Sequence, residues 1–112
     1  MEQQILCVDD EPSVLWMLET ALRGAGYTVR TASDGEEALE ILKQENIPVL
    51  LTDLRMPRMD GIELCRRARE LNPSIKVYAI SAYVNAYTPA QFEANGFSGY
   101  LAKPFALSAV RG

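Results

Sequence analysis

The sequence predicts an α/β fold in which a parallel sheet carries helices on both faces. Short apolar runs alternate along the chain with apolar residues at helical spacing, and such alternation is typical of parallel strands joined by right-handed crossovers. Acidic residues directly follow two of the apolar runs: Asp9 and Asp10 follow residues 5–8, and Asp53 follows residues 49–52. Because the carboxyl ends of strands flank the binding crevice in open α/β sheets, we expect these carboxylates to share one pocket.

The first strand–helix–strand unit is read from three local signals. Residues 5–8 form a short apolar run, which suits a central strand that is buried on both faces. Pro12 fits the first turn of a helix, and apolar residues recur at helical spacing from there, so we expect a helix over about 12–24 that stops before Gly26. Four of the five residues over 27–31 are β-branched or aromatic, and they predict the second strand.

The middle of the chain predicts two further helices around a buried strand. Asp34 can cap the second helix, and the acidic first turn that follows suits the positive end of a helix. Pro48 starts the third strand. Asp60, which we interpret only as a cap, and Gly61 begin the third helix, and residues 72–73 end it. The predicted apolar residues of the third helix are Ile62, Leu64, Cys65, Ala68 and Leu71.

The last part of the chain predicts two more strands around a short helix. Residues 75–81 form the fourth strand, and Thr88 with Pro89 resembles a cap and a first-position proline, so the fourth helix would run over about 89–95. Residues 99–102 supply the fifth strand. Only about eight residues follow Pro104, whereas the mean helix has about 11 or 12, so a fifth helix would be short.

Composition restricts the classes of protein to consider. The chain has 112 residues, which suits one domain, and 48% hydrophobic with 23% charged residues is typical of a globular protein. No apolar run approaches the roughly 20 residues of a membrane helix and no leader precedes Ile5, so we expect a cytoplasmic location without a membrane span. A net charge of -4 argues against direct binding of nucleic acid.

Cysteine and histidine usage narrows the chemistry. Cys7 and Cys65 both lie inside apolar patterns, so we expect them to be buried as small hydrophobic residues and not to form a disulfide or a metal site. The chain has no histidine, which removes the commonest general base and any Ser-His or Cys-His pair. Chemistry in this protein must therefore rest on carboxylates, hydroxyls and lysine.

Four groups of residues, taken in order, resemble the receiver domain of two-component response regulators. They are Asp9 and Asp10, the segment from Asp53 to Gly61, Ser81 with Ala82, and Lys103 with Pro104 and Phe105. The resemblance covers nearly the whole chain. It implies a flavodoxin-like, doubly wound five-stranded parallel sheet of order 2-1-3-4-5 with about five helices. It also implies a single receiver domain over residues 1–112, either complete or excised from a longer response regulator or hybrid kinase.

The acidic residues call for a cation on physical grounds, and the resemblance assigns their roles. Converging carboxylates repel one another, a divalent ion relieves the repulsion, and hard oxygen ligands favour Mg²⁺. By resemblance, Asp10 and Asp53 bind Mg²⁺ directly and the main-chain carbonyl of Arg55 adds a ligand. Asp9 would hold a water molecule on the ion.

The resemblance also implies the chemistry and the partners. Asp53 is expected to accept a phosphoryl group from a phosphohistidine on a sensor histidine kinase or a phosphotransfer protein, while Lys103 and Ser81 contact the phosphoryl oxygens. Ser81 and Tyr100 would then form a two-position switch. The domain would not be an enzyme for other substrates, since it promotes only its own phosphorylation and dephosphorylation. It would be a monomer or a weak, phosphorylation-dependent dimer.

Two other functional classes stay open. A receiver-like interaction module that works without phosphate would lack one of the acidic, hydroxyl or lysine positions, and none is lost here. A Mg²⁺-dependent phosphatase of the haloacid dehalogenase type also uses an aspartate nucleophile. Its nucleophile normally follows the first strand in an Asp-x-Asp pattern, whereas Asp9 and Asp10 are contiguous and no cap domain is available.

Several positions adjust these expectations. Ser81 stands where threonine is commoner, and Arg55 and Tyr83 occupy variable positions that influence the lifetime of the phosphate. Pro89 leaves residues 83–88 as a longer loop on the switch face. Trp16 and Met17 either pack or lie on the exposed side of the first helix, near where family members meet their kinases, whereas Met56 and Met59 are expected to pack.

Overall fold

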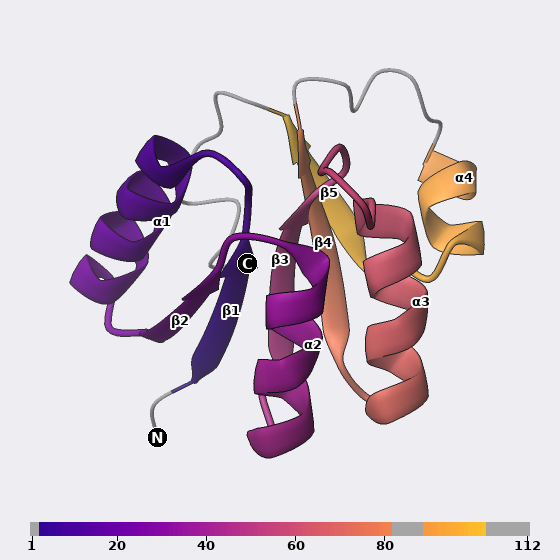
Figure 1. The fold of residues 1–112 in the computed structure, drawn as a ribbon, viewed down its shortest axis with the longest axis horizontal. Coiled ribbons are helices and arrows are strands. Elements are labelled where there is room, and N and C mark those ends of the chain that lie inside the picture. Colours follow the sequence, from indigo (N-terminus) through magenta and orange to yellow (C-terminus); the bar gives the residue numbers. More distant parts are fainter. Residues whose placement is uncertain (1–2, 82–88, 103–112) are drawn as a thin grey trace.

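The computed structural model describes residues 3–81 and 89–102 (Figure 1). Its strands are β1 Gln4–Val8, β2 Thr28–Ala32, β3 Val49–Asp53, β4 Lys76–Ser81 and β5 Gly99–Ala102. They form one parallel sheet in the order β2-β1-β3-β4-β5. The doubly wound order 2-1-3-4-5 is therefore confirmed.

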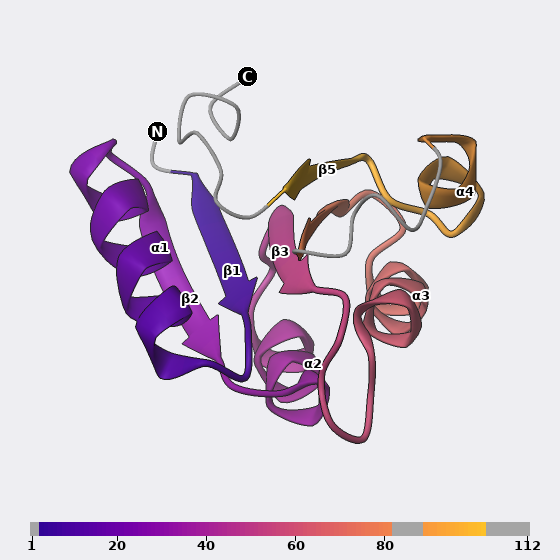
Figure 2. The same cartoon turned by 90° about the horizontal axis from the view of Figure 1, so that it is seen from above.

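Helices cover both faces of this sheet. They are α1 Pro12–Gly24, α2 Gly35–Gln44, α3 Gly61–Leu71 and α4 Pro89–Ala94. Figure 2 shows α1 on one side of the sheet and α2 and α3 on the other. The five predicted strands and the first four predicted helices are present, with small shifts at their ends: β2 begins at Thr28 and not at Tyr27, and β4 begins at Lys76 and not at Ile75.

Local capping explains where the helices begin. Asp34 accepts a hydrogen bond from the amide of Glu37 at 2.8 Å, and Asp60 accepts one from the amide of Glu63 at 2.8 Å. Both caps satisfy amides that have no partner within the helix, as the sequence predicts. Pro12 occupies the first turn of α1, where the missing N–H costs nothing.

The core has two halves, one on each face of the sheet, and β1 contributes to both by strict alternation. Leu6 and Val8 pack in the half that contains residues of α2 and α3, whereas Ile5 and Cys7 pack with Leu18 and other residues of α1. All five residues of β3 are buried. Since full burial of a large aliphatic side chain stabilises by about 1.5–3 kcal/mol, these strands hold the carboxyl edge of the sheet in place.

Both cysteines are free thiols inside the core, as the sequence predicts. Burial, and to a lesser extent the carboxylate of Glu19, raises the pKa of Cys7 to about 12. Burial also raises the pKa of Cys65. Each thiol is therefore held in its protonated, unreactive form near neutral pH.

Leu71, one of the apolar residues assigned to the third helix, is not buried. It is 46% exposed and lines an open groove beside Leu39 and Lys43 of α2. It is the last residue of α3, so the helix has run beyond the part that packs on the sheet.

Two predictions fall on residues that the structure does not describe. These are the short fifth helix after Pro104 and the loop over residues 83–88. Within the described ranges, none of the helices has the length and apolar character needed to cross a membrane.

The close approach of α3 to β3 yields a stability prediction. A Cβ on Gly61 would lie 2.2 Å from the main-chain oxygen of Asp53 and 3.0 Å from the Cα of Leu54, and neither atom can rotate away. We expect Gly61→Ala to lower the free energy of unfolding by roughly 1–3 kcal/mol, measured by urea denaturation. Gly24→Ala is the matched control, because a Cβ there meets nothing within 4 Å. Equal urea midpoints for the two variants would contradict this close contact.

The buried thiols yield a reactivity prediction. A raised pKa favours the protonated thiol, so at pH 8 the folded protein should react with iodoacetamide far more slowly at Cys7 and Cys65 than an unfolded chain does. Intact mass should show almost no adduct in buffer and two adducts in concentrated urea. Rapid labelling of the folded protein would show that these side chains are accessible.

Candidate functional site

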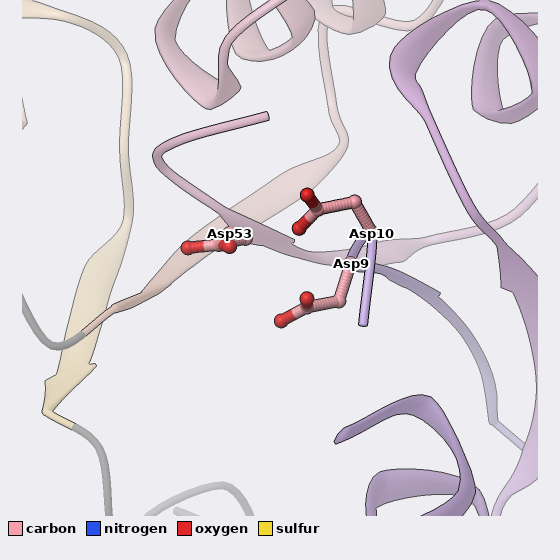
Figure 3. A group of neighbouring side chains, drawn as sticks. All are labelled: Asp9, Asp10 and Asp53. Carbon is pink, nitrogen blue, oxygen red and sulfur yellow. The ribbon is translucent and has the colours of Figure 1, made fainter. Parts of the chain in front are cut away.

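Three carboxylates meet at the carboxyl edge of the sheet (Figure 3). Asp9 and Asp10 directly follow β1, and Asp53 is the last residue of β3. One oxygen from each of the three side chains lies within 4.8 Å of the other two. The convergence expected from the sequence is therefore present.

Strand register explains this convergence. Val8 of β1 pairs with Thr52 of β3, so the residues that follow them, Asp9 and Asp53, lie at the same level of the sheet edge. A shift of one residue would point each side chain of the shifted strand into the other half of the core, and core packing therefore fixes the register. The sheet itself brings two acidic residues from distant parts of the sequence together.

Asp9 is buried and held in place by hydrogen bonds. Its side chain is only 1% exposed, and its Oδ1 accepts a hydrogen bond from the amide of Glu11 at 2.9 Å. Its own amide donates to the carbonyl of Ala32 at 3.2 Å, which ties the end of β1 to the end of β2. These contacts orient a carboxylate that the fold has largely removed from solvent.

Asp53 is also buried, at 7% exposed, whereas Asp10 is exposed. The hydroxyl of Thr52 donates to the main-chain oxygen of Asp53 at 2.9 Å. On the other side, the amide of Gly61 donates to the carbonyl of Leu54 at 3.0 Å and closes the loop that follows β3. The site thus combines two anchored carboxylates with one that faces solvent.

The donor set fits Mg²⁺. Carboxylate oxygens are hard ligands, and opposite ligands of an octahedral Mg²⁺ lie about 4.2 Å apart, given Mg–O distances of about 2.1 Å. The three oxygens, all within 4.8 Å of one another, approach this span, and a water on one carboxylate would accommodate the difference. Grouped negative charge at this spacing is relieved by a divalent cation.

The other predicted site residues are only partly described. The main chain of Ser81 ends β4 and pairs with Ala102, and that of Tyr100 pairs with Ala79. The side chains of Ser81 and Tyr100, and the whole of Lys103, lie outside the described residues. Arg55 is in the loop directly after β3.

The sequence did not point to three groups that support the site: the amide of Glu11, the hydroxyl of Thr52, and Gly61 beside the carbonyl of Asp53. For Gly61 a signal existed, since glycine in a first helical turn is a poor helix former and calls for a steric reason. The other two are main-chain or short-range contacts, which the residue types alone do not predict.

Comparison with known proteins agrees with this geometry. The family model of the response regulator receiver domain matches residues 5–111. The DNA-binding transcriptional regulator NtrC of Escherichia coli (strain K12) is 40% identical over 98 residues, which cover 88% of this chain and 21% of NtrC. The chain thus spans about a fifth of the length of that relative.

Solved structures agree as well. Chemotaxis response regulator CheY4 of Vibrio cholerae superposes with a TM-score of 0.90 at 29% identity, covering 99% of this chain and 98% of CheY4. A Burkholderia pseudomallei response regulator that carries a phosphorylated aspartic acid and a calcium ion gives a TM-score of 0.89 at 26% identity, covering 98% of this chain and 65% of that chain. The chain therefore belongs to the response regulator receiver domain family.

Proposed function

We propose that this domain accepts a phosphoryl group on Asp53 from a phosphohistidine of a sensor histidine kinase or a histidine phosphotransfer protein. The observation that carries the proposal is the meeting of Asp53 with Asp9 and Asp10 at one edge of the sheet. The phosphorylated aspartic acid of the similar Burkholderia pseudomallei protein supports the same chemistry.

Four residues would hold the metal ion. Asp10 and Asp53 would bind Mg²⁺ directly, the main-chain carbonyl of Arg55 would add a ligand, and Asp9 would hold a bound water. When present, Mg²⁺ neutralises negative charge on the carboxylates and on the phosphoryl oxygens. The calcium ion in the similar Burkholderia pseudomallei structure is consistent with an oxygen-ligand cation site.

The transfer step balances without any further reactant. A carboxylate oxygen of Asp53 forms a bond to phosphorus, the bond between phosphorus and the imidazole nitrogen breaks, and the electron pair stays on that nitrogen, which takes a proton. Hydrolysis of the aspartyl phosphate later returns the carboxylate and inorganic phosphate. The domain thus promotes only its own phosphorylation and dephosphorylation.

The remaining roles follow the family pattern. Lys103 and Ser81 would contact phosphoryl oxygens, and Ser81 with Tyr100 would couple the new charge to a change of conformation. The main chain of Ser81 extends β4 one residue beyond Ile80, which pairs with Asp53, and this placement supports its role.

Partner contacts are part of the same proposal. Trp16 is 66% exposed and Met17 is 46% exposed on α1, and we assign them to contact with the kinase or phosphotransfer protein. We expect no direct contact of this domain with nucleic acid, a cytoplasmic location, and a monomer or a weak dimer that forms on phosphorylation. NtrC is described as a DNA-binding transcriptional regulator, which suggests an output function outside the matched region.

Phosphorylation can be tested with acetyl phosphate as a small-molecule donor. Incubation with Mg²⁺ should add one phosphoryl group to the parent, measured by intact mass, and none to Asp53→Asn, because the amide is not a nucleophile. Asp60→Asn is the control, since Asp60 caps α3 and asparagine caps equally well. Equal labelling of the parent and Asp53→Asn would refute the assignment.

Metal binding can be tested separately. Asp10→Asn should weaken the affinity for Mn²⁺, titrated by the loss of its free electron paramagnetic resonance signal, by roughly tenfold or more because one anionic ligand is lost. Labelling by acetyl phosphate should also stop when excess chelator removes the cation. An unchanged Mn²⁺ affinity in Asp10→Asn, with Asp60→Asn as the reference, would exclude Asp10 as a ligand.

A further inference from the structure

The β3–α3 loop (residues 54–60) is fastened to the start of α2, a helix that carries none of the site residues. Its base is closed by the hydrogen bond from Gly61 to Leu54. Arg58 and Met59 of the loop contact Asp34 and Gly35, respectively, at the start of α2. These contacts join segments more than twenty positions apart, as the separation of 24 between Asp34 and Arg58 shows.

The tightest of these contacts is between Met59 and Gly35. Met59 is only 8% exposed. A Cβ on Gly35 would lie 2.6 Å from the Sδ of Met59 and 3.0 Å from its Cβ and Cγ. The Sδ lies near the end of a flexible side chain and can rotate away, but the Cβ and Cγ lie nearer the main chain and must give by a few tenths of an ångström. A side chain at position 35 therefore requires a small shift of Met59 or of the start of α2.

A second contact runs through Asp34. Its Oδ1 caps α2 through the amide of Glu37 at 2.8 Å, and its Oδ2 accepts a hydrogen bond from the guanidinium of Arg58 at 3.1 Å. Arg58 has a φ of 69°, a left-handed conformation that L residues with a full side chain rarely adopt. The turn around Arg58 is thus set in a specific shape while its side chain reaches α2.

We propose that Gly35, Met59 and Asp34 are positioning residues of the metal site. The inference rests on the proposed function, since it concerns the loop whose Arg55 carbonyl would be a ligand. The loop spans seven positions between β3 and α3, so a displacement at Met59 moves Arg55 unless the short chain between them absorbs it. Mg²⁺ and Mn²⁺ bind a fixed set of oxygens at short distances, and a shifted carbonyl weakens binding.

Gly35→Ala tests the steric contact directly. We expect the affinity for Mn²⁺, titrated by electron paramagnetic resonance, to fall on the order of tenfold, as for other residues that orient metal ligands. Gly24→Ala is the matched control: it makes the same change in a helix where a Cβ has open space, and it should keep the parent affinity. Parent affinity in a folded Gly35→Ala protein would overturn the proposal.

A double-mutant cycle separates positioning from general destabilisation. Met59→Ala removes the Cγ and Sδ that a side chain at position 35 would meet, so adding it to Gly35→Ala should weaken Mn²⁺ binding by less than the product of the two single effects. If Gly35→Ala does not fold, Met59→Ala alone decides, because loss of this anchor should still weaken binding severalfold. Multiplicative effects, or parent affinity in Met59→Ala, would overturn the proposal.

The role of Asp34 has its own matched pair. Asp34→Asn keeps a cap for α2 but removes the charge that faces Arg58, whereas Asp60→Asn makes the same change at the cap of α3. We expect a small loss of Mn²⁺ affinity, up to about threefold, in Asp34→Asn only, because the pair is exposed. Equal Mn²⁺ affinities for these two variants would show that Asp34 is not a positioning residue of the metal site.

Failure of this inference differs from failure of the proposed function. If the parent does not bind Mn²⁺, or if Asp10→Asn has the same Mn²⁺ affinity as the parent, the assignment of the metal site is wrong. If the parent binds Mn²⁺, Asp10→Asn loses it and Gly35→Ala retains it, only the positioning role falls.

Discussion

The site depends on the hydrophobic core, which holds three carboxylates together although their negative charges repel one another. Unit charges about 4 Å apart repel by roughly 1 kcal/mol in water and roughly 4 kcal/mol at an effective dielectric constant of 20. Asp9 and Asp53 are largely buried and lie beside Asp10. They stay together because β1 and β3 are buried parallel neighbours whose register cannot slip without moving every side chain of a strand into the other half of the core. A divalent cation would lower the repulsion among the carboxylates that the fold holds at this edge of the sheet.

Local sequence signals predicted the fold well. Hydrophobic periodicity and capping residues act over a few positions, so Asp34 and Asp60 marked the starts of α2 and α3 correctly. The same locality explains why the exposure of Leu71 could not be predicted. Periodicity tells which way a side chain points from a helix, but it does not tell where the helix runs past the surface that would cover it.

The candidate site was predicted in a similarly uneven way. The three carboxylates could be predicted from acidic residues at strand ends. The carboxyl ends of parallel strands lie at the same edge of the sheet, so residues at these ends come close together. The contacts around the loop after β3 could not be found in this way. The packing of Met59 on Gly35 joins two helix starts that are far apart in sequence, and it depends on how closely α2 approaches the loop. Such a distance follows from the packed structure and from no local pattern.

Magnitudes indicate which contact governs the loop. The pair between Arg58 and Asp34 has an arginine side chain that is 70% exposed, and exposed pairs contribute about 0.2–1 kcal/mol and weaken with salt. Forcing a methyl group into the contact of Met59 with Gly35 would cost about 1–3 kcal/mol, since a tightly packed interior cannot yield freely. Packing therefore fixes the loop and the ion pair only refines it. Screening of this ion pair by salt should therefore change the geometry offered to a cation less than a methyl group at position 35 does.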